Sequence, residues 1–248
     1  MRSKGFTLIE LLTVVSLTGI LLAILLPALG AARKQGRAVC CLSNLRQLAL
    51  AAELYTSSND GYYPIAYMYA RKDSRFISYA WDFTTIRDWS EGEQKVIPGL
   101  LWQGQTIEKI HQCPSFKGAH NWLNDPYTGY NYNTSYIGHG QLESIETPAN
   151  TDQIIRPGNC ALFGDGGYIS GANKFMRAPW PNPGDLNFSD RYAGTQDYRH
   201  LGATNVAYCD GSAKSVRKLY TDTDKWSRDK IAKGTGFLSP DNSAYDLK

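Results

Sequence analysis

Two residues in the last quarter of the chain have the chemical types of a general base and a general acid. His200 precedes Asp210 with nine residues between them. An extended strand rises about 3.3 Å per residue, so a strand joining the two would hold them roughly 30 Å apart. No G-x-S-x-G or H-E-x-x-H signature is present. We therefore expect structural roles, Asp210 with Gly211 in a turn and His200 where the chain enters a sheet, and a protein that is not an enzyme.

Two further sets of side chains have the types that bind metal ions. Zinc prefers histidine and cysteine, but the spacing of the available residues matches no standard zinc pattern. These residues are His111, Cys113, His120 and His139. Calcium prefers carboxylate oxygens on loops and is the more realistic metal. Acidic side chains on loops, however, more commonly contact only solvent and bind no metal. The candidate ligands, which lack EF-hand spacing, are Asp165, Asp222, Asp224 and Asp241. We expect no cofactor unless these aspartates bind calcium.

A third chemical feature is a single carboxylate inside a long apolar run. Residues 6–29 contain one ionisable side chain, Glu10. As a helix this segment would be about 36 Å long, enough to cross a hydrocarbon layer of roughly 30 Å. A carboxylate in such a segment costs roughly 2.5–3.5 kcal/mol near the centre, less near the end, and normally has a partner. The run contains no basic side chain, so the nearest positive group would be a terminal amine at Phe6.

The residues around Glu10 carry a family resemblance. Lys4 to Glu10 reads KGFTLIE, a basic leader followed by a Gly-Phe junction and a carboxylate four residues past the Phe. This segment resembles the class III signal of type IV prepilins and type II secretion pseudopilins. The resemblance implies that a prepilin peptidase cuts after Gly5 and methylates the new N-terminus, Phe6. It also implies that Glu10 of an incoming subunit pairs with the terminal amine of a neighbouring subunit.

Two simpler interpretations of the N-terminus compete with this one. A secretory signal peptide cut after Ala32 would have an apolar core of 7–15 residues, shorter than the run observed. A plain single-pass anchor would not need the GFTLIE sequence. Loop charges do not settle the orientation, because basic residues lie on both sides of the span. They are Arg2 and Lys4 before it and Arg33, Lys34 and Arg37 after it. A C-terminal domain outside the cytoplasm is therefore implied by the resemblance.

The helical pattern continues beyond the apolar run. Apolar and small residues recur at spacings of three and four, as on one face of an amphipathic helix. They are Ala38, Cys41, Leu42, Leu45, Leu48, Ala49, Ala52 and Tyr55. Turn-forming residues from Ser57 to Gly61 should end the helix. Gly19 should weaken it and Pro27 should kink it, and many type IV pilins have Gly and Pro in similar places.

The rest of the chain fits one globular domain outside the cytoplasm. We divide the sequence into a leader (1–5), a membrane and filament-core helix (6–29), its amphipathic continuation (30–58) and the domain (59–248). Strands are expected at 65–69, 75–83 and 159–164, a loop at 121–140, and a hairpin over 204–217 with a two-residue Asp210-Gly211 turn. The formal net charge of +3 is too small to indicate a nucleic-acid partner.

The cysteines allow a cross-link between the helix and the domain. The chain has five, at 40, 41, 113, 160 and 209, so at least one thiol has no partner within the chain. Outside the cytoplasm disulfides are allowed. A disulfide from Cys113 to Cys41 or Cys40 is the preferred arrangement, and it would close a loop of about 70 residues and add a few kcal/mol in the entropic model. The sequence does not fix the connectivity.

A second resemblance extends over most of the chain. His200 and Asp210-Gly211 resemble the H-X9-DG motif of a large group of prepilin-like proteins. The segments Cys41–Gln47, Cys113-Pro114 and Tyr130–Tyr132 and residue Pro64 resemble other signatures of that group. The resemblance implies an α+β fold, with a long N-terminal helix packed on an antiparallel β-sheet with long loops. It also implies that the first half of this helix spans the membrane and that the second half is amphipathic.

The function implied by both resemblances is assembly. The chain would be a structural subunit of a type IV pilus-like or type II secretion pseudopilus filament, held in the inner membrane before assembly. Its partners would be further copies of itself, other pilin-like subunits, prepilin peptidase and an inner-membrane assembly platform. The alternatives are a pilin-like adhesin or glycan-binding surface protein with a simple membrane anchor, and a minor pseudopilin at a filament tip. A membrane-anchored enzyme is a third alternative, which the lack of a catalytic constellation disfavours. Tip subunits often lack a residue equivalent to Glu10, which favours a subunit of the filament body.

Overall fold

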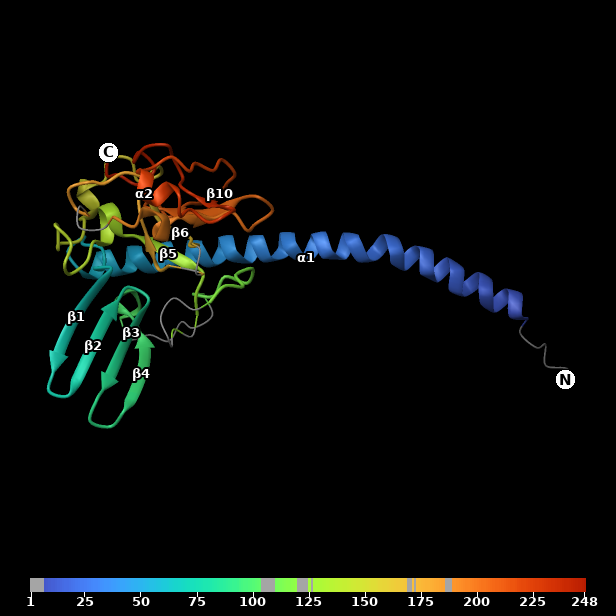
Figure 1. Ribbon diagram of the computed structural model, residues 1–248, viewed down its shortest axis with the longest axis horizontal. Helices are drawn as coiled ribbons and strands as arrows, with labels where there is room; N and C mark the ends of the chain where they lie inside the picture. Colours follow the sequence, from blue (N-terminus) through green and yellow to red (C-terminus); the bar gives the residue numbers. More distant parts are fainter. Residues whose placement is uncertain are drawn as a thin grey trace.

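A single long helix organises the molecule. The computed structural model describes residues 7–103, 110–119, 125, 127–168, 171, 173–185 and 189–248. The helix α1 (Leu8–Ser58) carries the globular domain on its C-terminal half, while its N-terminal half projects away from the domain (Figure 1). The helix begins at a capping box formed by Thr7 and Glu10. It ends before Gly61, whose φ of +80° lies in the left-handed region that glycine adopts easily.

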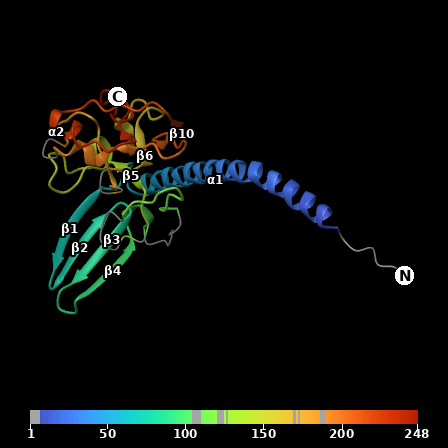
Figure 2. The same cartoon turned by 45° about the vertical axis from the view of Figure 1, so that its right-hand side comes forward.

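The two halves of α1 have different surroundings. Residues 7–37 are all exposed, and the fully buried positions begin at Cys41. The buried residues are Cys41, Leu45, Leu48, Ala49, Ala52 and Thr56. Five of these six belong to the face that the spacing of apolar residues predicts. This apolar face of α1 therefore packs against the domain. The helix remains continuous through Gly19 and Pro27, and its N-terminal half curves gently (Figures 1 and 2).

The domain is built around a five-stranded sheet against which α1 packs. The strand order is β10 (Ala213–Val216), β9 (Thr204–Tyr208), β6 (Ala161–Asp165), β5 (Tyr130–Asn133) and β7 (Phe175–Met176). Neighbouring strands are antiparallel except for β5 and β7, which are parallel. The helix contacts β9, β10 and β6. The predicted α+β arrangement of a long helix on antiparallel strands is confirmed.

The C-terminal hairpin lies where the sequence predicts it. Strands β9 and β10 pair antiparallel with Ala207 opposite Ala213. The turn is longer than the predicted two-residue turn, because the Tyr208 N–H donates to the Ser212 carbonyl and leaves three residues between them. Gly211 adopts a φ of +78° in this loop. The result is the common three-residue hairpin with a glycine in the left-handed region.

A second sheet extends from the other side of α1. It is a meander of β1 (Tyr67–Lys72), β2 (Arg75–Ala80), β3 (Phe83–Asp88) and β4 (Glu93–Pro98) in sequence order. Figures 1 and 2 show it on the side of the helix opposite to β10 and α2 (Lys225–Arg228). The prediction of a single strand at 75–83 is wrong, because β2 ends at Ala80 and β3 begins at Phe83. The chain breaks at Trp81, a fully buried side chain that packs against Tyr132 and Phe163 in the core.

The loop predicted at 121–140 is also wrong in part, because it contains the buried strand β5. The two asparagines of this strand, Asn131 and Asn133, are fully buried. Asn133 donates from Nδ2 to the carbonyls of Ala161 and Tyr245, at 2.8 and 2.9 Å. Asn131 donates from Nδ2 to the Thr195 carbonyl at 3.3 Å, so the amide nitrogens of both side chains are paired inside the core, and a strand that reads as polar in the sequence is stable there. A short pair, β8 (Gln196–Asp197) with β11 (Thr235–Gly236), completes the strands among the described residues.

Candidate functional site: the N-terminal helix and the cluster at its base

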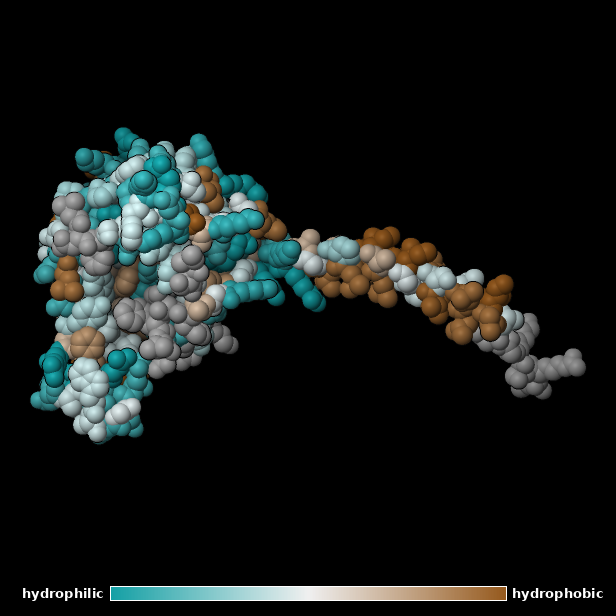
Figure 3. Space-filling model, viewed as in Figure 1, coloured by the Kyte–Doolittle hydropathy of each residue, from teal (hydrophilic) through white to brown (hydrophobic). Residues whose placement is uncertain are grey.

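The N-terminal half of α1 presents an apolar surface that nothing in the described part of the chain covers. Figure 3 shows apolar residues along the projecting helix and mainly polar ones on the domain. Its leucines, isoleucines and valines from Leu8 to Leu29 are between 44% and 83% exposed. This part of α1 is long and apolar enough to cross a membrane. Water is an unfavourable environment for so much contiguous apolar surface, which marks it as an interaction surface for lipid or other helices.

Glu10 has a local partner at the start of this surface. Its Oε2 accepts hydrogen bonds from the Thr7 backbone N–H at 2.9 Å and from the Thr7 hydroxyl at 2.8 Å. The sequence analysis did not assign a role to Thr7, although Thr-x-x-Glu ahead of an apolar run is the pattern that indicates a capping box. Gly5 and Phe6, the predicted sites of cleavage and methylation, lie outside the described residues.

The second feature is a buried cluster where α1 meets the sheet. Cys41 on α1, Cys113 in the segment 110–119, Asp165 at the end of β6 and His200 before β9 are each at most 4% exposed. One ligand-type atom from each of the four lies within 4.8 Å of the others. The Sγ atoms of Cys41 and Cys113 are 3.4 Å apart and both thiols are free. The two cysteines therefore meet, and the disulfide between them remains a prediction.

Arg199 supplies a positive charge to this cluster. Its guanidinium donates to Cys113 Sγ at 3.2 Å and to Asp165 Oδ1 at 3.1 Å, and it also bonds the Gly129 carbonyl. No spacing in the sequence indicates this role, because the partners of Arg199 come from separate segments. Burial disfavours the charge on Arg199, but the neighbouring Asp165 carboxylate outweighs that effect and raises the pKa of the guanidinium.

Burial and polar contacts have opposite effects on the pKa values of three members of the cluster, His200, Cys113 and Asp165. Burial lowers the pKa of His200, but bonds to Asp165 and Cys113 raise it to about 9. Burial raises the pKa of Cys113, but bonds from Cys41 and His200 and the charge of Arg199 lower it to about 5. Burial also opposes ionisation of Asp165, yet Arg199 and His200 hold its pKa below the usual range. The cluster therefore favours the charged forms of these three residues, whereas burial, followed by the neighbouring Cys113 and Asp165, raises the pKa of the Cys41 thiol.

His200 and Asp210 do not form a pair. The His200 ring contacts Asp165 Oδ2 at 3.2 Å and Cys113 Sγ at 3.6 Å, both through Nε2. Asp210 instead accepts a hydrogen bond from the Ser212 N–H at 2.9 Å within the hairpin loop. The H-X9-DG spacing thus joins two separate local structures, one in the buried cluster and one in the turn.

The zinc set considered from the sequence is not assembled in the described part of the chain. His111 is packed among aromatic rings, where it accepts from the Trp102 indole N–H, and burial lowers its pKa to about 4. His139 lies 3.7 Å from Glu143 in a different place. His120 lies outside the described residues. Cys113 of that set belongs to the cluster described above.

The four aspartates considered for calcium have separate partners. Asp165 belongs to the buried cluster, whereas Asp222 pairs with Arg228 at 2.8 Å on the surface. Asp224 caps α2 by accepting from the Ser227 N–H at 3.0 Å. Asp241 accepts from the backbone and hydroxyl of Ser243. Among the residues that the structure describes, these carboxylates do not converge on one site.

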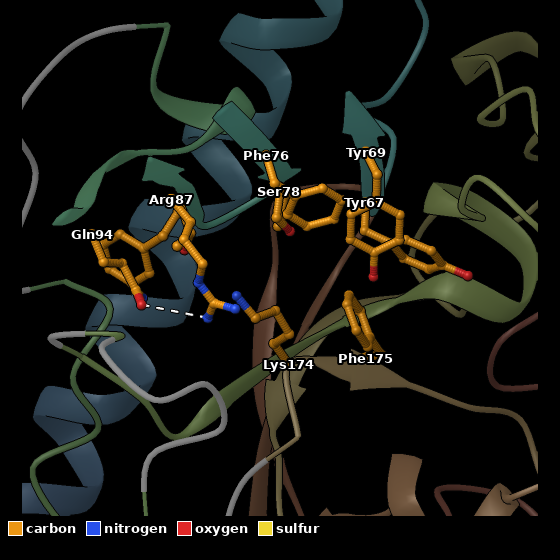
Figure 4. Close-up of a pocket in the computed structure, with 11 residues that line it drawn as sticks. Tyr67, Tyr69, Phe76, Ser78, Arg87, Gln94, Lys174 and Phe175 are labelled. Carbon is orange, nitrogen blue, oxygen red and sulfur yellow. Dashed lines mark hydrogen bonds between the residues drawn. The ribbon is translucent and has the colours of Figure 1, made fainter. Parts of the chain in front are cut away.

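A small aromatic pocket lies between the meander and β7. It encloses about 110 Å³. Its main lining residues are Tyr67, Tyr69, Phe76, Arg87, Lys174 and Phe175. Figure 4 shows the rings of Tyr67, Tyr69 and Phe76 close together, with Arg87 bonded to Gln94 on the other side of the pocket. Lys174 is held by Asp82 and Asp125, each at 2.9 Å. Aromatic side chains with a few polar groups also line many small-molecule sites.

Comparisons with known proteins agree with the N-terminal features. Residues 1–26 match the family model of the prokaryotic N-terminal methylation motif. The type IV wide pilus major component PilA4 of Thermus thermophilus is 42% identical over 61 residues, which cover 25% of this chain and 47% of that relative. The match thus spans about half of the relative's length, and no solved structure matches the chain. The motif and the relative support a type IV pilin-like protein, and the exposed apolar helix agrees with them.

Proposed function

We propose that this protein is a structural subunit of a type IV pilus-like or type II secretion pseudopilus filament, of the H-X9-DG group. The observation that carries the proposal is the division of α1. Its C-terminal half is buried on the domain, while its N-terminal half exposes apolar side chains and one carboxylate. Burying a leucine side chain is worth about 1.5–3 kcal/mol, so this half is stable in lipid or among other helices.

During filament assembly the apolar half of α1 is surrounded first by lipid and then by other helices. The helix first lies in the inner membrane, with the domain outside the cytoplasm, and prepilin peptidase cuts after Gly5 and methylates Phe6. The assembly platform then moves the subunit into a filament in which apolar helix halves of several subunits pack together. Glu10 pairs with the terminal amine of a neighbour and fixes the register. The filament contains copies of this chain and other pilin-like subunits.

We also propose that the buried cluster and the H-X9-DG motif have a structural role and not a catalytic one. A catalytic cysteine–histidine–carboxylate arrangement uses the two ring nitrogens of the histidine for different partners. Here Cys113 and Asp165 both face Nε2 of His200. All three side chains are buried, which leaves no room for a substrate beside the thiol.

The experiment that tests the proposal is N-terminal mass spectrometry of the full chain made with an active prepilin peptidase. The proposal expects a chain that begins at N-methylated Phe6. A chain that begins at Met1 would instead indicate a plain membrane anchor. A chain that begins near Ala31 would indicate a secreted domain, and either of these two results would contradict the proposal.

A second candidate function is glycan binding at the aromatic pocket. The stacked rings of Tyr69 and Phe76, with centroids 5.5 Å apart, and the neighbouring cation Arg87 favour it. The test is a glycan array with the full chain in detergent, comparing Tyr69→Ala with Trp226→Ala, an exposed aromatic residue on α2. Binding that only Tyr69→Ala abolishes would support this function, and binding that neither or both abolish would count against it.

A further inference from the structure

We propose that Cys41, Cys113, Asp165 and His200 form a structural zinc site that fastens the globular domain to α1. The four residues come from four different parts of the chain, one on the helix and three on the domain. All four are buried, and their ligand atoms lie within 4.8 Å of one another. This inference does not depend on filament assembly.

The donor set and the distances suit a tetrahedral zinc ion. Zinc takes thiolate sulfur at about 2.3 Å and imidazole nitrogen or carboxylate oxygen at about 2.0–2.2 Å, so tetrahedral ligand atoms stand about 3.3–3.8 Å apart. The two Sγ atoms are 3.4 Å apart and Cys113 Sγ is 3.6 Å from His200 Nε2. Asp165 lies 3.0 Å from Cys41 Sγ through Oδ1 and 3.2 Å from His200 Nε2 through Oδ2. Because the four ligand atoms lie within 4.8 Å of one another, shifts of up to about 1 Å would complete the coordination.

The surrounding groups suit the charge of such a site. A zinc ion with two thiolates, one carboxylate and a neutral imidazole carries one net negative charge. The Arg199 guanidinium contacts both Cys113 Sγ and Asp165 Oδ1 and offsets that charge. Outer groups of this kind orient metal ligands. Two further donors do so here, the Tyr130 hydroxyl at 3.3 Å from Cys41 Sγ and the Asn205 N–H at 2.7 Å from Asp165 Oδ2.

The orientation of His200 supports the same site. Both polar contacts that the structure gives its side chain run through Nε2, the atom that faces the other three ligands. Its Nδ1 is buried without a hydrogen-bond partner among the described residues, and this atom would hold the ring proton when Nε2 binds the ion. Zinc binding replaces two protons, the thiol proton of Cys41 and the one that the Cys113–His200 pair holds; both pass to solvent, and no oxidant is required. Because one ligand lies on α1, binding couples to docking of the domain on the helix.

The alternative to zinc is a disulfide between Cys41 and Cys113, which would leave neither sulfur free to bind the metal. The two states are separated by thiol alkylation of the full chain, purified in detergent without chelator from zinc-supplemented cells and mapped by peptide mass. A zinc site predicts that both cysteines become reactive after a strong zinc chelator is added, without reductant. Reactivity that requires reductant, or that does not change with chelator, would overturn the proposal.

Metal content of folded variants gives an independent readout. We expect about one zinc ion per chain in the wild type and in Cys40→Ser, whose exposed thiol is adjacent to Cys41 on the helix. His200→Gln and Cys113→Ser should retain less than about one-tenth of that zinc, because even outer-shell changes weaken binding 10–100-fold. Circular dichroism selects the variants that fold. A wild type without zinc, or a folded His200→Gln with wild-type zinc content, would overturn the site.

Discussion

Thr7 and Glu10 satisfy each other's polar groups at the first turn of α1. The Glu10 carboxylate accepts from the N–H and the hydroxyl of Thr7, and the Glu10 N–H donates to the Thr7 hydroxyl at 3.3 Å. In a separate chain the carboxylate therefore already has a partner. The proposed pairing with a neighbour's amine has to replace these bonds. Assembly therefore needs the charge of Glu10, whereas helix capping needs only its hydrogen-bond acceptor.

The variant Glu10→Gln distinguishes the capping role of Glu10 from its proposed charge pairing. A glutamine at this position still closes a capping box but carries no charge. We expect normal cleavage after Gly5 and a severe loss of filaments, measured by mass spectrometry and by electron microscopy of sheared filaments. Thr7→Val is the matched control, since it removes the capping hydroxyl and keeps the charge, and it should assemble. Filaments from Glu10→Gln at wild-type abundance would refute the charge pairing.

The burial pattern of α1 predicts a contrast between two leucines on the same helix. Leu45 is fully buried against the domain, whereas Leu50 is 54% exposed. Leu45→Ala should lower the free energy of unfolding of the domain by about 2–5 kcal/mol, and Leu50→Ala should change it by less than about 0.5 kcal/mol. Denaturant unfolding followed by tryptophan fluorescence measures both. Equal effects would show that the domain does not pack on this face of the helix.

Two glycines provide a second contrast. A Cβ at Gly99 would collide with the backbone of Ala80 and Phe83, whereas a Cβ at Gly36 meets no atom within 4 Å. Gly99→Ala should destabilise the domain by about 1–3 kcal/mol, because backbone cannot move aside as a flexible side chain can. Gly36→Ala should stabilise the helix by about 0.5–1 kcal/mol. Thermal unfolding checks both signs, and an unchanged melting temperature for Gly99→Ala would contradict the close approach.

Asp88 makes the stability of the meander depend on pH. It accepts from Arg75 Nε at 2.8 Å, from both the N–H and the hydroxyl of Ser90, and from the Ser74 hydroxyl. The bond from Arg75, followed by those from the serines, holds the pKa of Asp88 below its usual range. A carboxyl whose pKa is lowered on folding stabilises the fold above its unfolded pKa of about 4 and loses that contribution as the pH falls.

We therefore expect faster amide exchange in β2 and β3 of Asp88→Asn than of the wild type at pH 7, after correction for intrinsic rates. The difference should shrink as the pH is lowered below about 4, because protonation removes the same interactions from the wild type. Glu146→Gln, at an exposed position outside the meander, is the control and should match the wild type throughout. A difference that persists unchanged at low pH would rule out the carboxylate as its cause.

Local patterns in the sequence determined the parts of the structure that depend on neighbours along the chain. The three-and-four spacing from Ala38 to Tyr55 identified the buried face of α1, because helix geometry alone puts those positions on one side. Asp210-Gly211 marked the hairpin, because glycine adopts the left-handed backbone of the turn. The KGFTLIE segment indicated the type IV pilin-like class. Within the same local range, Thr7 was readable as the capping partner of Glu10.

Tertiary structure alone decided what distant segments do together. Asn131 and Asn133 look like loop residues, and only the carbonyls of other segments make them stable inside a strand. Asp165 looks like one of several loop acids, yet the fold buries it between Cys41, Arg199 and His200. These contacts join residues far apart in the sequence, and they are set by how the sheet packs on the helix. No spacing along one segment encodes that packing, because its geometry depends on the whole core at once.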